Sequence, residues 1–349
     1  MEPETSIRQA LGDKYEILLV IGRGGMATVY KAIQNSLNRL VALKVIHQNL
    51  VHDEEFVGRF LREAQVCGQL NHPHIVTVYD YGSIGSVHYM SMEYLEGETL
   101  REKIKSRGTL GVDETVSYIH TIAQALGYIH HKGIVHRDVK SSNIFITNEG
   151  RPVLMDFGIV YSKGIESLSQ YGAVLGTPEY MSPEQADGKI KADGRSDIYS
   201  LGVIMFECLT GRLPFKSDNH LATLHQILHE EPPKVKEFNT KVPGWLAEII
   251  AGCLVKDRSF RIPDGYMLSD ALRNRETPDY VNNASRWKTR EFYTNRVENK
   301  NNDSEKYSKN KKNRKHERDS VDKNRPWFVA IFITLFVILV ILGIYVAGT

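Results

Sequence analysis

The sequence predicts an α+β fold on its N-terminal side and a separate apolar segment at its C-terminal end. Residues 15–21 (YEILLVI) and 27–33 (ATVYKAI) are rich in β-branched and aromatic residues and flank a glycine-rich turn, which predicts a hairpin. Residues 39–46 (RLVALKVI) predict a further strand, and the apolar positions of 54–70 (EEFVGRFLREAQVCGQL) recur at helical spacing. Residues 327–349 contain no charged residue.

Length and composition are those of a globular protein with an additional segment. The chain has 349 residues, of which 42% are hydrophobic and 25% charged, enough for one large or two medium domains. The three cysteines, Cys67, Cys208 and Cys253, show no C-x-x-C spacing. The sequence therefore predicts neither a zinc site nor a disulfide framework.

The net charge of +2 conceals a basic tail. Residues 281–325 contain 14 Lys/Arg, 7 Asp/Glu and nine asparagines, and they lack long apolar runs. Such a segment cannot bury enough apolar surface to offset its ordering entropy, so we expect 274–326 to be a disordered linker. Two interpretations remain open. The linker lies against an anionic membrane surface, or it is a solvated spacer whose charge only sets the topology.

The uncharged run WFVAIFITLFVILVILGIYVAGT, residues 327–349, predicts one transmembrane helix, because about 20 apolar residues span the hydrocarbon core. The basic cluster KNKKNRKHER on its N-terminal side predicts a single-pass protein of the cell membrane with a cytoplasmic body. The opening MEPETSIRQA does not resemble a signal peptide. Very few residues remain beyond the span, so either the outer portion is very short or the chain has been cut short.

The glycine-rich stretch IGRGGMATVY, residues 21–30, suggests a phosphate-binding loop, but its pattern occurs in dinucleotide folds and in kinases. A dinucleotide loop runs from a strand into a helix. Here the loop is followed by a second strand, and Lys44 lies in the next one. A hairpin lid over phosphates followed by a strand lysine is the protein-kinase arrangement.

The rest of the chain contains further motifs in the same order. They are V-A-L-K at 41–44, Glu63 in the predicted helix, HRDVKSSN at 136–143, DFG at 156–158 and S-P-E at 182–184. With these motifs the sequence resembles the eukaryotic-like (Hanks-type) Ser/Thr protein kinases, most closely the bacterial membrane-anchored branch. The resemblance covers roughly residues 14–273. Its departures are S-P-E in place of A-P-E, and KDRSFRIP at residues 256–263 in place of the usual D-P-x-x-R-P, with Arg261 kept.

The resemblance implies a two-lobed protein-kinase fold. A small lobe of antiparallel sheet and one helix would be joined by a hinge, residues 92–95, to a large and mainly helical lobe. The resulting domain organisation is an N-terminal extension (1–14), a kinase domain (15–273), a juxtamembrane linker (274–326) and a transmembrane helix (327–349).

The resemblance also implies that ATP binds between the lobes. Glycines in the loop would let the backbone approach the phosphates, where any Cβ would obstruct, although a plain tight hairpin also uses glycine. The residues expected to bind the nucleotide are Ile21, Gly22, Arg23, Gly24, Gly25, Met26, Ala27, Thr28, Val29, Ala42, Lys44, Met92, Glu93, Leu95 and Phe145. Ala27 stands where many relatives have a third glycine.

Five catalytic residues follow from the same resemblance. Asp138 is the expected base, which orients the substrate hydroxyl, and Lys140 would stabilise the transferred phosphate. Lys44 would contact the α- and β-phosphates and pair with Glu63. The hydroxyl of Thr177 would link the substrate loop to Asp138 and Lys140.

Two further residues, Asn143 and Asp156, are expected to bind Mg²⁺, or alternatively Mn²⁺, because amide and carboxylate oxygens are hard ligands. The resemblance assigns scaffold roles to four more residues. Glu184 and Arg261 would form a buried ion pair, Asp197 would brace the catalytic loop (residues 136–143), and His136 would be a packing residue.

Arg137, directly before Asp138, is typical of kinases controlled by activation-loop phosphorylation, since a phosphate can pair with arginine. The candidate acceptors are Ser167, Ser169, Tyr171 and Thr177, and we expect autophosphorylation at Ser169.

In the family that the sequence resembles, a lysine two positions after the catalytic aspartate marks Ser/Thr kinases, so Lys140 implies protein substrates with Ser/Thr acceptors. Relatives also dimerise through the small lobe, and no nucleic-acid partner is expected. The main alternative is a catalytically weak kinase-fold scaffold at the membrane. A kinase of small molecules or lipids is disfavoured by the docking stretch GTPEYMSPE.

Overall fold

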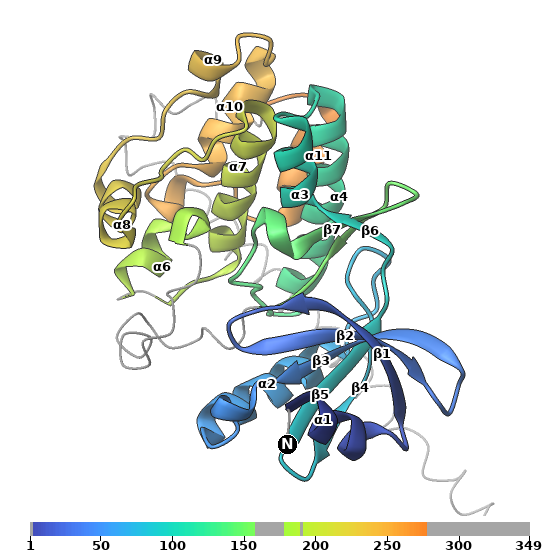
Figure 1. The fold of residues 1–349 in the computed structure, drawn as a ribbon. Helices are drawn as coiled ribbons and strands as arrows, with labels where there is room; N and C mark the ends of the chain where they lie inside the picture. Colours follow the sequence, from blue (N-terminus) through green and yellow to red (C-terminus); the bar gives the residue numbers. More distant parts are fainter. Residues whose placement is uncertain (1–2, 158–177, 189–190, 278–349) are drawn as a thin grey trace, which may run out of the picture. The chain divides into compact units, whose positions relative to one another are not determined.

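The computed structural model describes residues 3–157, 178–188 and 191–277, which form a sheet-containing small lobe and a mainly helical large lobe (Figure 1). The two-lobed fold expected from the sequence is confirmed. Within these residues no helix combines the length and apolarity that crossing a membrane requires. The predicted linker and span, together with Ser167, Ser169, Tyr171 and Thr177, lie outside the described residues.

The small lobe is built on a five-stranded antiparallel sheet with the order β1-β2-β3-β5-β4. Its strands are β1 (Tyr15–Arg23), β2 (Ala27–Gln34), β3 (Arg39–Ile46), β4 (Val78–Ile84) and β5 (Val87–Glu93). The three strands predicted from the sequence are confirmed, and β1 extends two residues further into the glycine-rich stretch. Gly22 pairs with Val29 and Arg23 with Thr28, so this stretch is a hairpin turn rather than a strand-to-helix loop.

Helix α2 (Glu54–Cys67) covers one face of the sheet, where Phe56, Phe60 and Ala64 are buried in a cluster with strand residues. Its first turn is capped by Asp53, whose side chain accepts a hydrogen bond from the backbone N–H of Phe56 at 2.9 Å. The predicted helix continued to residue 70, but the observed helix ends before Gly68, a weak helix former.

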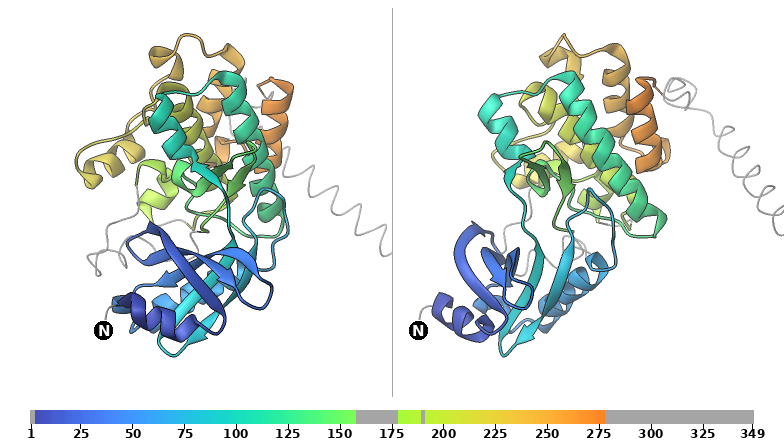
Figure 2. Two further views of the ribbon diagram at one scale, coloured as in Figure 1. Left: turned by 45° about the vertical axis from the view of Figure 1, so that its right-hand side comes forward. Right: turned by 90° about the vertical axis from the view of Figure 1, so that its right-hand side faces the viewer.

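The N-terminal extension contains a helix that the sequence analysis did not predict. In α1 (Pro3–Leu11), Ile7 and Leu11 lie four residues apart on one helix face and pack into a cluster with Tyr15 and Tyr30 of the sheet. Figure 2 shows α1 lying against the small lobe. The extension is therefore part of the small-lobe core.

We expect Leu11→Ala to lower the free energy of unfolding by about 2 kcal/mol, because Leu11 is fully buried and its loss leaves a cavity. Gln9→Ala, on the exposed side of the same helix, is the matched control. Chemical denaturation of both variants tests this. Equal stability of the two variants would mean that α1 does not contribute to the core.

The large lobe contains helices and a second, three-stranded sheet of order β6-β7-β8. The helices are α3 (Leu100–Arg107), α4 (Val112–His131), α6 (Pro183–Asp187), α7 (Gly194–Thr210), α8 (His220–His229), α9 (Val235–Phe238), α10 (Gly244–Cys253) and α11 (Gly265–Asn274). The strands are β6 (Gly97–Thr99), β7 (Ile144–Thr147) and β8 (Pro152–Leu154).

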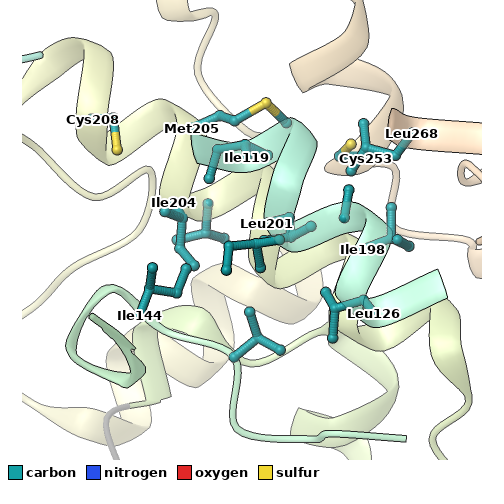
Figure 3. Close-up of a cluster of buried hydrophobic side chains, with 14 of the residues drawn as sticks. Ile119, Leu126, Ile144, Ile198, Leu201, Ile204, Met205, Cys208, Cys253 and Leu268 are labelled. Atoms are coloured by element: carbon teal, nitrogen blue, oxygen red, sulfur yellow. The ribbon is translucent and has the colours of Figure 1, made fainter. Parts of the chain in front are cut away.

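Helix α7 is the centre of the large-lobe core. It is buried continuously from Ser196 to Leu209, which explains why its sequence is apolar on almost all sides. Figure 3 shows Leu201 and Met205 of α7 among side chains of α4 and its neighbours. Helix α11 packs closely on α4 because residue 265 is glycine: a Cβ there would collide with the carbonyl oxygen of Ala123.

Hydrogen bonds connect the two lobes beside the hinge. The side chain of Arg151, between β7 and β8, donates to Glu93 at 2.8 Å. The backbone N–H of Val76 donates to the carbonyl oxygen of Leu154 at 3.0 Å. The first contact holds the end of β5, and the second holds the residues before β4, near the strands that precede Asp156.

Candidate active site

In the glycine-rich turn, no neighbouring protein atom lies so close to Gly22, Gly24 or Gly25 that a side chain would be excluded. The backbone N–H of Gly24 donates to the carbonyl oxygen of Ala27 at 2.9 Å, closing the turn. A Cβ at Gly25 would meet no atom within 4 Å, and one at Gly22 would meet only the Val29 Cβ, at 3.9 Å. Glycines that the protein itself does not need suit a loop that a ligand approaches closely.

Five of the residues predicted to hold the nucleotide lie in or against one apolar cluster, formed mainly by small-lobe residues. Ala42 of β3 and Met92 of β5 are paired across the sheet and are both buried. Met26, Val29 and Leu95 pack against the same cluster. Such a cluster offers the apolar lining that a planar base requires.

Other predicted nucleotide residues lie outside this cluster. Ile21 and Arg23 of β1 are exposed, whereas Ala27 is buried. Thr28 is also buried, and its hydroxyl lies 3.1 Å from Nε2 of His47. The hydroxyl of Thr28 therefore already has a hydrogen-bonding partner, His47, within the protein.

Two more predicted nucleotide residues lie in the hinge and in the large lobe. Glu93 is the final residue of β5, and its backbone N–H donates to the carbonyl oxygen of Thr77 at 2.9 Å. Phe145 lies in β7 of the large lobe, paired with Val153.

The strand lysine lies directly against the aspartate of the DFG motif. Lys44 Nζ is 2.7 Å from Asp156 Oδ1. Burial would lower the pKa of Lys44, but attraction to Asp156 and Glu63 outweighs it and raises the pKa. Burial would likewise raise the pKa of Asp156, but the attraction of Lys44 lowers it. Both groups are therefore charged at neutral pH.

The expected ion pair between Lys44 and Glu63 is not formed among the described residues, which corrects the sequence prediction. Glu63 is only 5% exposed, and this burial raises its pKa to about 8, an effect that Lys44 offsets only in part. Asp156 is the carboxylate that pairs with Lys44, and Glu63 acts on Lys44 only as a more distant charge.

The stability of the protein should fall with rising pH because of Glu63. The pKa of Glu63 is raised from 4.5 to about 8, so its stabilising contribution is complete below about pH 4.5 and is lost as pH rises to about 8. We expect Glu63→Gln to remove this dependence. The stability of the wild type relative to the variant should fall by at most about 1.4 kcal/mol per pH unit in that interval.

Denaturation of both proteins between pH 5 and 8 is the measurement, with Glu54→Gln on the exposed side of α2 as the control. A pH-independent difference between the wild type and Glu63→Gln would contradict the raised pKa.

The catalytic loop holds Asp138 by two neighbouring side chains. Lys140 Nζ lies 2.7 Å from Asp138 Oδ2, and Asn143 Nδ2 donates to the same oxygen at 2.9 Å. Asn143 also donates to the carbonyl oxygen of Asp138 at 2.9 Å. One carboxylate oxygen of Asp138 is thus anchored, and the other can accept a proton from a substrate.

The donor set near Asp156 fits a hard divalent cation. The amide nitrogen of Asn143 is occupied by Asp138, which leaves its amide oxygen as a ligand. The carboxylate of Asp156 is ionised. Oxygen ligands of this kind are those that Mg²⁺ prefers.

Asp197, at the start of α7, fixes the backbone of the catalytic loop. Its two carboxylate oxygens accept hydrogen bonds from the backbone N–H groups of His136 at 2.9 Å and Arg137 at 2.8 Å. His130 Nε2 lies 2.8 Å from the same carboxylate, a contact that the sequence analysis missed. His136 is fully buried with its ring against Phe157, as expected for a packing residue.

Two site residues adopt a backbone conformation that is costly for residues other than glycine. Arg137 has φ of 68° and Asp156 has φ of 47°. Such strain persists only where surrounding contacts hold it, and it is frequent at functional sites. For Arg137 those contacts are the bond to Asp197 and the 2.8 Å bond that its carbonyl oxygen accepts from Gln185.

Glu184 and Arg261 form the expected buried ion pair. Arg261 donates to both carboxylate oxygens, at 2.7 and 3.0 Å, and Ser196 donates to one of them at 2.6 Å. Burial would raise the pKa of Glu184, but these bonds lower it. The pair ties the residues after the activation segment to the end of the large lobe, and Thr177 lies just outside the described residues.

The sequence is similar to a known protein family and to several of its bacterial members. The protein kinase domain family matches residues 15–271. The chain is 42% identical over 269 residues to a probable serine/threonine-protein kinase of Streptomyces coelicolor, and 41% identical over 251 residues to the serine/threonine-protein kinase PrkC of Bacillus subtilis. These alignments cover 75% and 72% of the chain but only 39% of either relative.

A solved structure shows the same fold. The crystal structure of the Mycobacterium tuberculosis PknI kinase domain superposes with a TM-score of 0.61 at 27% identity. The superposition covers 75% of this chain and 96% of that one.

Proposed function

The chain belongs to the protein kinase family, and from that premise we propose that it is a membrane-anchored serine/threonine protein kinase. It would transfer the γ-phosphate of ATP to Ser or Thr hydroxyls of proteins. The observation that supports this most is the grouping of Lys44, Asp138, Lys140, Asn143 and Asp156 in one site, each with a defined partner. None of the residues required for phosphoryl transfer is replaced.

The chain's own residues would act as follows. Asp138 orients the acceptor hydroxyl and takes its proton as the hydroxyl oxygen bonds to the γ-phosphorus, while the bond from the γ-phosphorus to the bridging oxygen breaks and ADP leaves with that electron pair. Lys140, 2.7 Å from Asp138, neutralises charge on the transferred group, and Lys44 does so on the remaining phosphates. Asn143 and Asp156 would hold Mg²⁺, which screens phosphate charge when bound.

Matched peptides test the acceptor specificity of the full chain. Three peptides that differ only in a single Ser, Thr or Tyr are incubated with the chain, ATP and Mg²⁺, and the products are identified by mass spectrometry. Phosphate on Ser and Thr only is the expected result. Phosphate on Tyr at a comparable rate would contradict the proposed acceptor class.

Activation by autophosphorylation at Ser169 is the second part of the proposal. It is supported by Arg137, whose buried Nε has no hydrogen-bond partner among the described residues and could donate to a phosphate. Ser169→Ala should lower the activity, whereas Ser167→Ala should not. Equal activity of Ser169→Ala and wild type, with no phosphate elsewhere in the loop, would exclude this site.

Membrane anchoring through residues 327–349 rests on the uncharged run and on the basic residues before it. The proposed topology has a cytoplasmic kinase domain. Flotation with liposomes should retain the full chain and release a chain that ends at residue 326. Retention of both would assign binding to the basic linker.

Dimerisation through the small lobe is proposed from the relatives of the family. Sedimentation of the full chain in detergent at several concentrations tests it. A monomer throughout would contradict the proposal.

A further inference from the structure

The glycine-rich turn has an open tip and an anchored arm. At the tip, a Cβ at Gly25 would meet no atom within 4 Å. The arm that leads into β2 differs, because Ala27 and Thr28 are buried. Two contacts from His47, the residue after β3, hold this arm. The backbone N–H of His47 donates to the carbonyl oxygen of Met26 at 3.0 Å, and Nε2 of its ring lies 3.1 Å from the hydroxyl of Thr28.

The segment that carries His47 is itself joined to the sheet. The carbonyl oxygen of His47 accepts a hydrogen bond from the backbone N–H of Leu50 at 3.0 Å, which forms a short 3-10 turn. The side chain of Gln48 donates to the hydroxyl of Ser86, between β4 and β5, at 3.1 Å. His47 therefore offers the turn a support that is fixed to the small lobe from a second direction.

The contact between His47 and Thr28 lies on the face of the sheet that points away from the nucleotide-binding cluster. Side chains alternate between the two faces along a strand. Val29 and Ile46 pack in or against the nucleotide-binding cluster, so their neighbours Thr28 and His47 point to the opposite face. Thr28 also pairs across the ladder with Val45, which belongs to the cluster beneath α1. Neither side chain faces a bound nucleotide, so each can affect it only through the turn.

We propose that His47 is a positioning residue for the phosphates of ATP. Its bond to Thr28 would hold the arm of the turn in the position from which the tip, Gly24 and Gly25, covers the phosphates. The inference rests on the proposed kinase function. A turn that is already oriented binds its ligand without a further ordering cost, which is the benefit of preorganisation. The ring of His47 should therefore influence the phosphate end of the nucleotide and not the base.

The affinity for ATP, compared with that for adenosine, tests the proposal with the full chain. Both ligands are titrated by calorimetry in the presence of Mg²⁺. In His47→Leu, and in Thr28→Val, the dissociation constant for ATP should rise about three- to tenfold, as for the loss of one hydrogen bond. Adenosine has no phosphate and should bind as it does to the wild type. In steady-state transfer to a Ser peptide, the KM for ATP should rise while kcat changes little.

Conservative variants separate this bond from a general weakening of the small lobe. His47→Gln places an amide, which can donate and accept, near the position of Nε2, and Thr28→Ser keeps the hydroxyl. Both should restore most of the affinity for ATP. The double variant Thr28→Val/His47→Leu should bind ATP no more weakly than the weaker single variant, because both changes break the same bond.

His52→Leu, at an exposed position before α2, is the matched control and should bind both ligands like the wild type. Two results would overturn the inference. The first is a His47→Leu chain that binds ATP as tightly as the wild type. The second is an equal loss of affinity for ATP and adenosine, which would make the contact part of the small-lobe structure only.

This inference and the proposed function fail in different ways. A wild type that binds ATP but transfers no phosphate would contradict the kinase function, and the binding comparison would still decide the role of His47. A wild type that binds ATP no more tightly than adenosine would show that the turn holds no phosphate. That result would overturn the inference whatever the transfer assay gives.

Discussion

Lys44→Met is expected to lower kcat for phosphoryl transfer by about 10²- to 10³-fold, the usual effect of removing one preorganised electrostatic group. Lys44 Nζ lies 2.7 Å from Asp156 Oδ1. Methionine keeps the length and apolar bulk of the side chain but removes the charge, so the change reports on electrostatics more than on packing. Steady-state kinetics with a Ser peptide gives kcat, and nucleotide titration gives the affinity for ATP.

The control for Lys44→Met is Lys236→Met, an exposed lysine of α9. It should retain the wild-type kcat. A Lys44→Met chain that is folded and transfers phosphate at the wild-type rate would exclude Lys44 from the chemistry and would leave its contact with Asp156 as a structural ion pair.

Arg261→Met is expected to lower the free energy of unfolding by roughly 3–5 kcal/mol, because it leaves Glu184 buried without a counter-charge. The Arg261 side chain is 0% exposed and that of Glu184 4% exposed. Arg261 also donates to the backbone carbonyl oxygens of Val255, Lys256 and Arg195, and these would lose a donor as well. Chemical denaturation followed by tryptophan fluorescence measures the loss.

The double variant Glu184→Gln/Arg261→Met separates the two causes. Neutralising Glu184 removes the unpaired charge, so part of the stability should return, while the cost of the unsatisfied carbonyl oxygens remains. Arg273→Met, whose exposed pair with Asp270 should contribute less than about 1 kcal/mol, is the control. A single variant as stable as this control would contradict the structural role of the buried pair.

The features that could be predicted from the sequence are those set by local pattern. The first three strands follow from β-branched and aromatic residues around a turn, and α2 follows from apolar residues at helical spacing. The residues around Asp138 come from one continuous loop, so their closeness follows from their spacing. The contacts of Asp197 and Arg261 were expected only because the motifs resemble a known family.

What could not be predicted depends on the tertiary environment. Helix α1 is short, and its Ile7 and Leu11 form a weak pattern that becomes stabilising only where the sheet offers an apolar face. Glu63 was expected to pair with Lys44, but its protonation depends on burial, which no local pattern reports. Likewise, His130 lies 67 residues before its partner Asp197, and Ser196 lies 12 residues after its partner Glu184, so neither contact follows from a local motif.

The most direct test of the kinase function is single-turnover transfer of labelled γ-phosphate to a Ser peptide by the full chain, beside Asp138→Asn, with ATP binding measured for both. Asp138 is the expected base, so we expect transfer by the wild type and a loss of about 10²- to 10⁴-fold in the variant at equal ATP occupancy. A wild type that binds ATP and Mg²⁺ but transfers no phosphate, or a variant as fast as the wild type, would contradict this expectation. The first of these results would instead identify the chain as a kinase-fold scaffold.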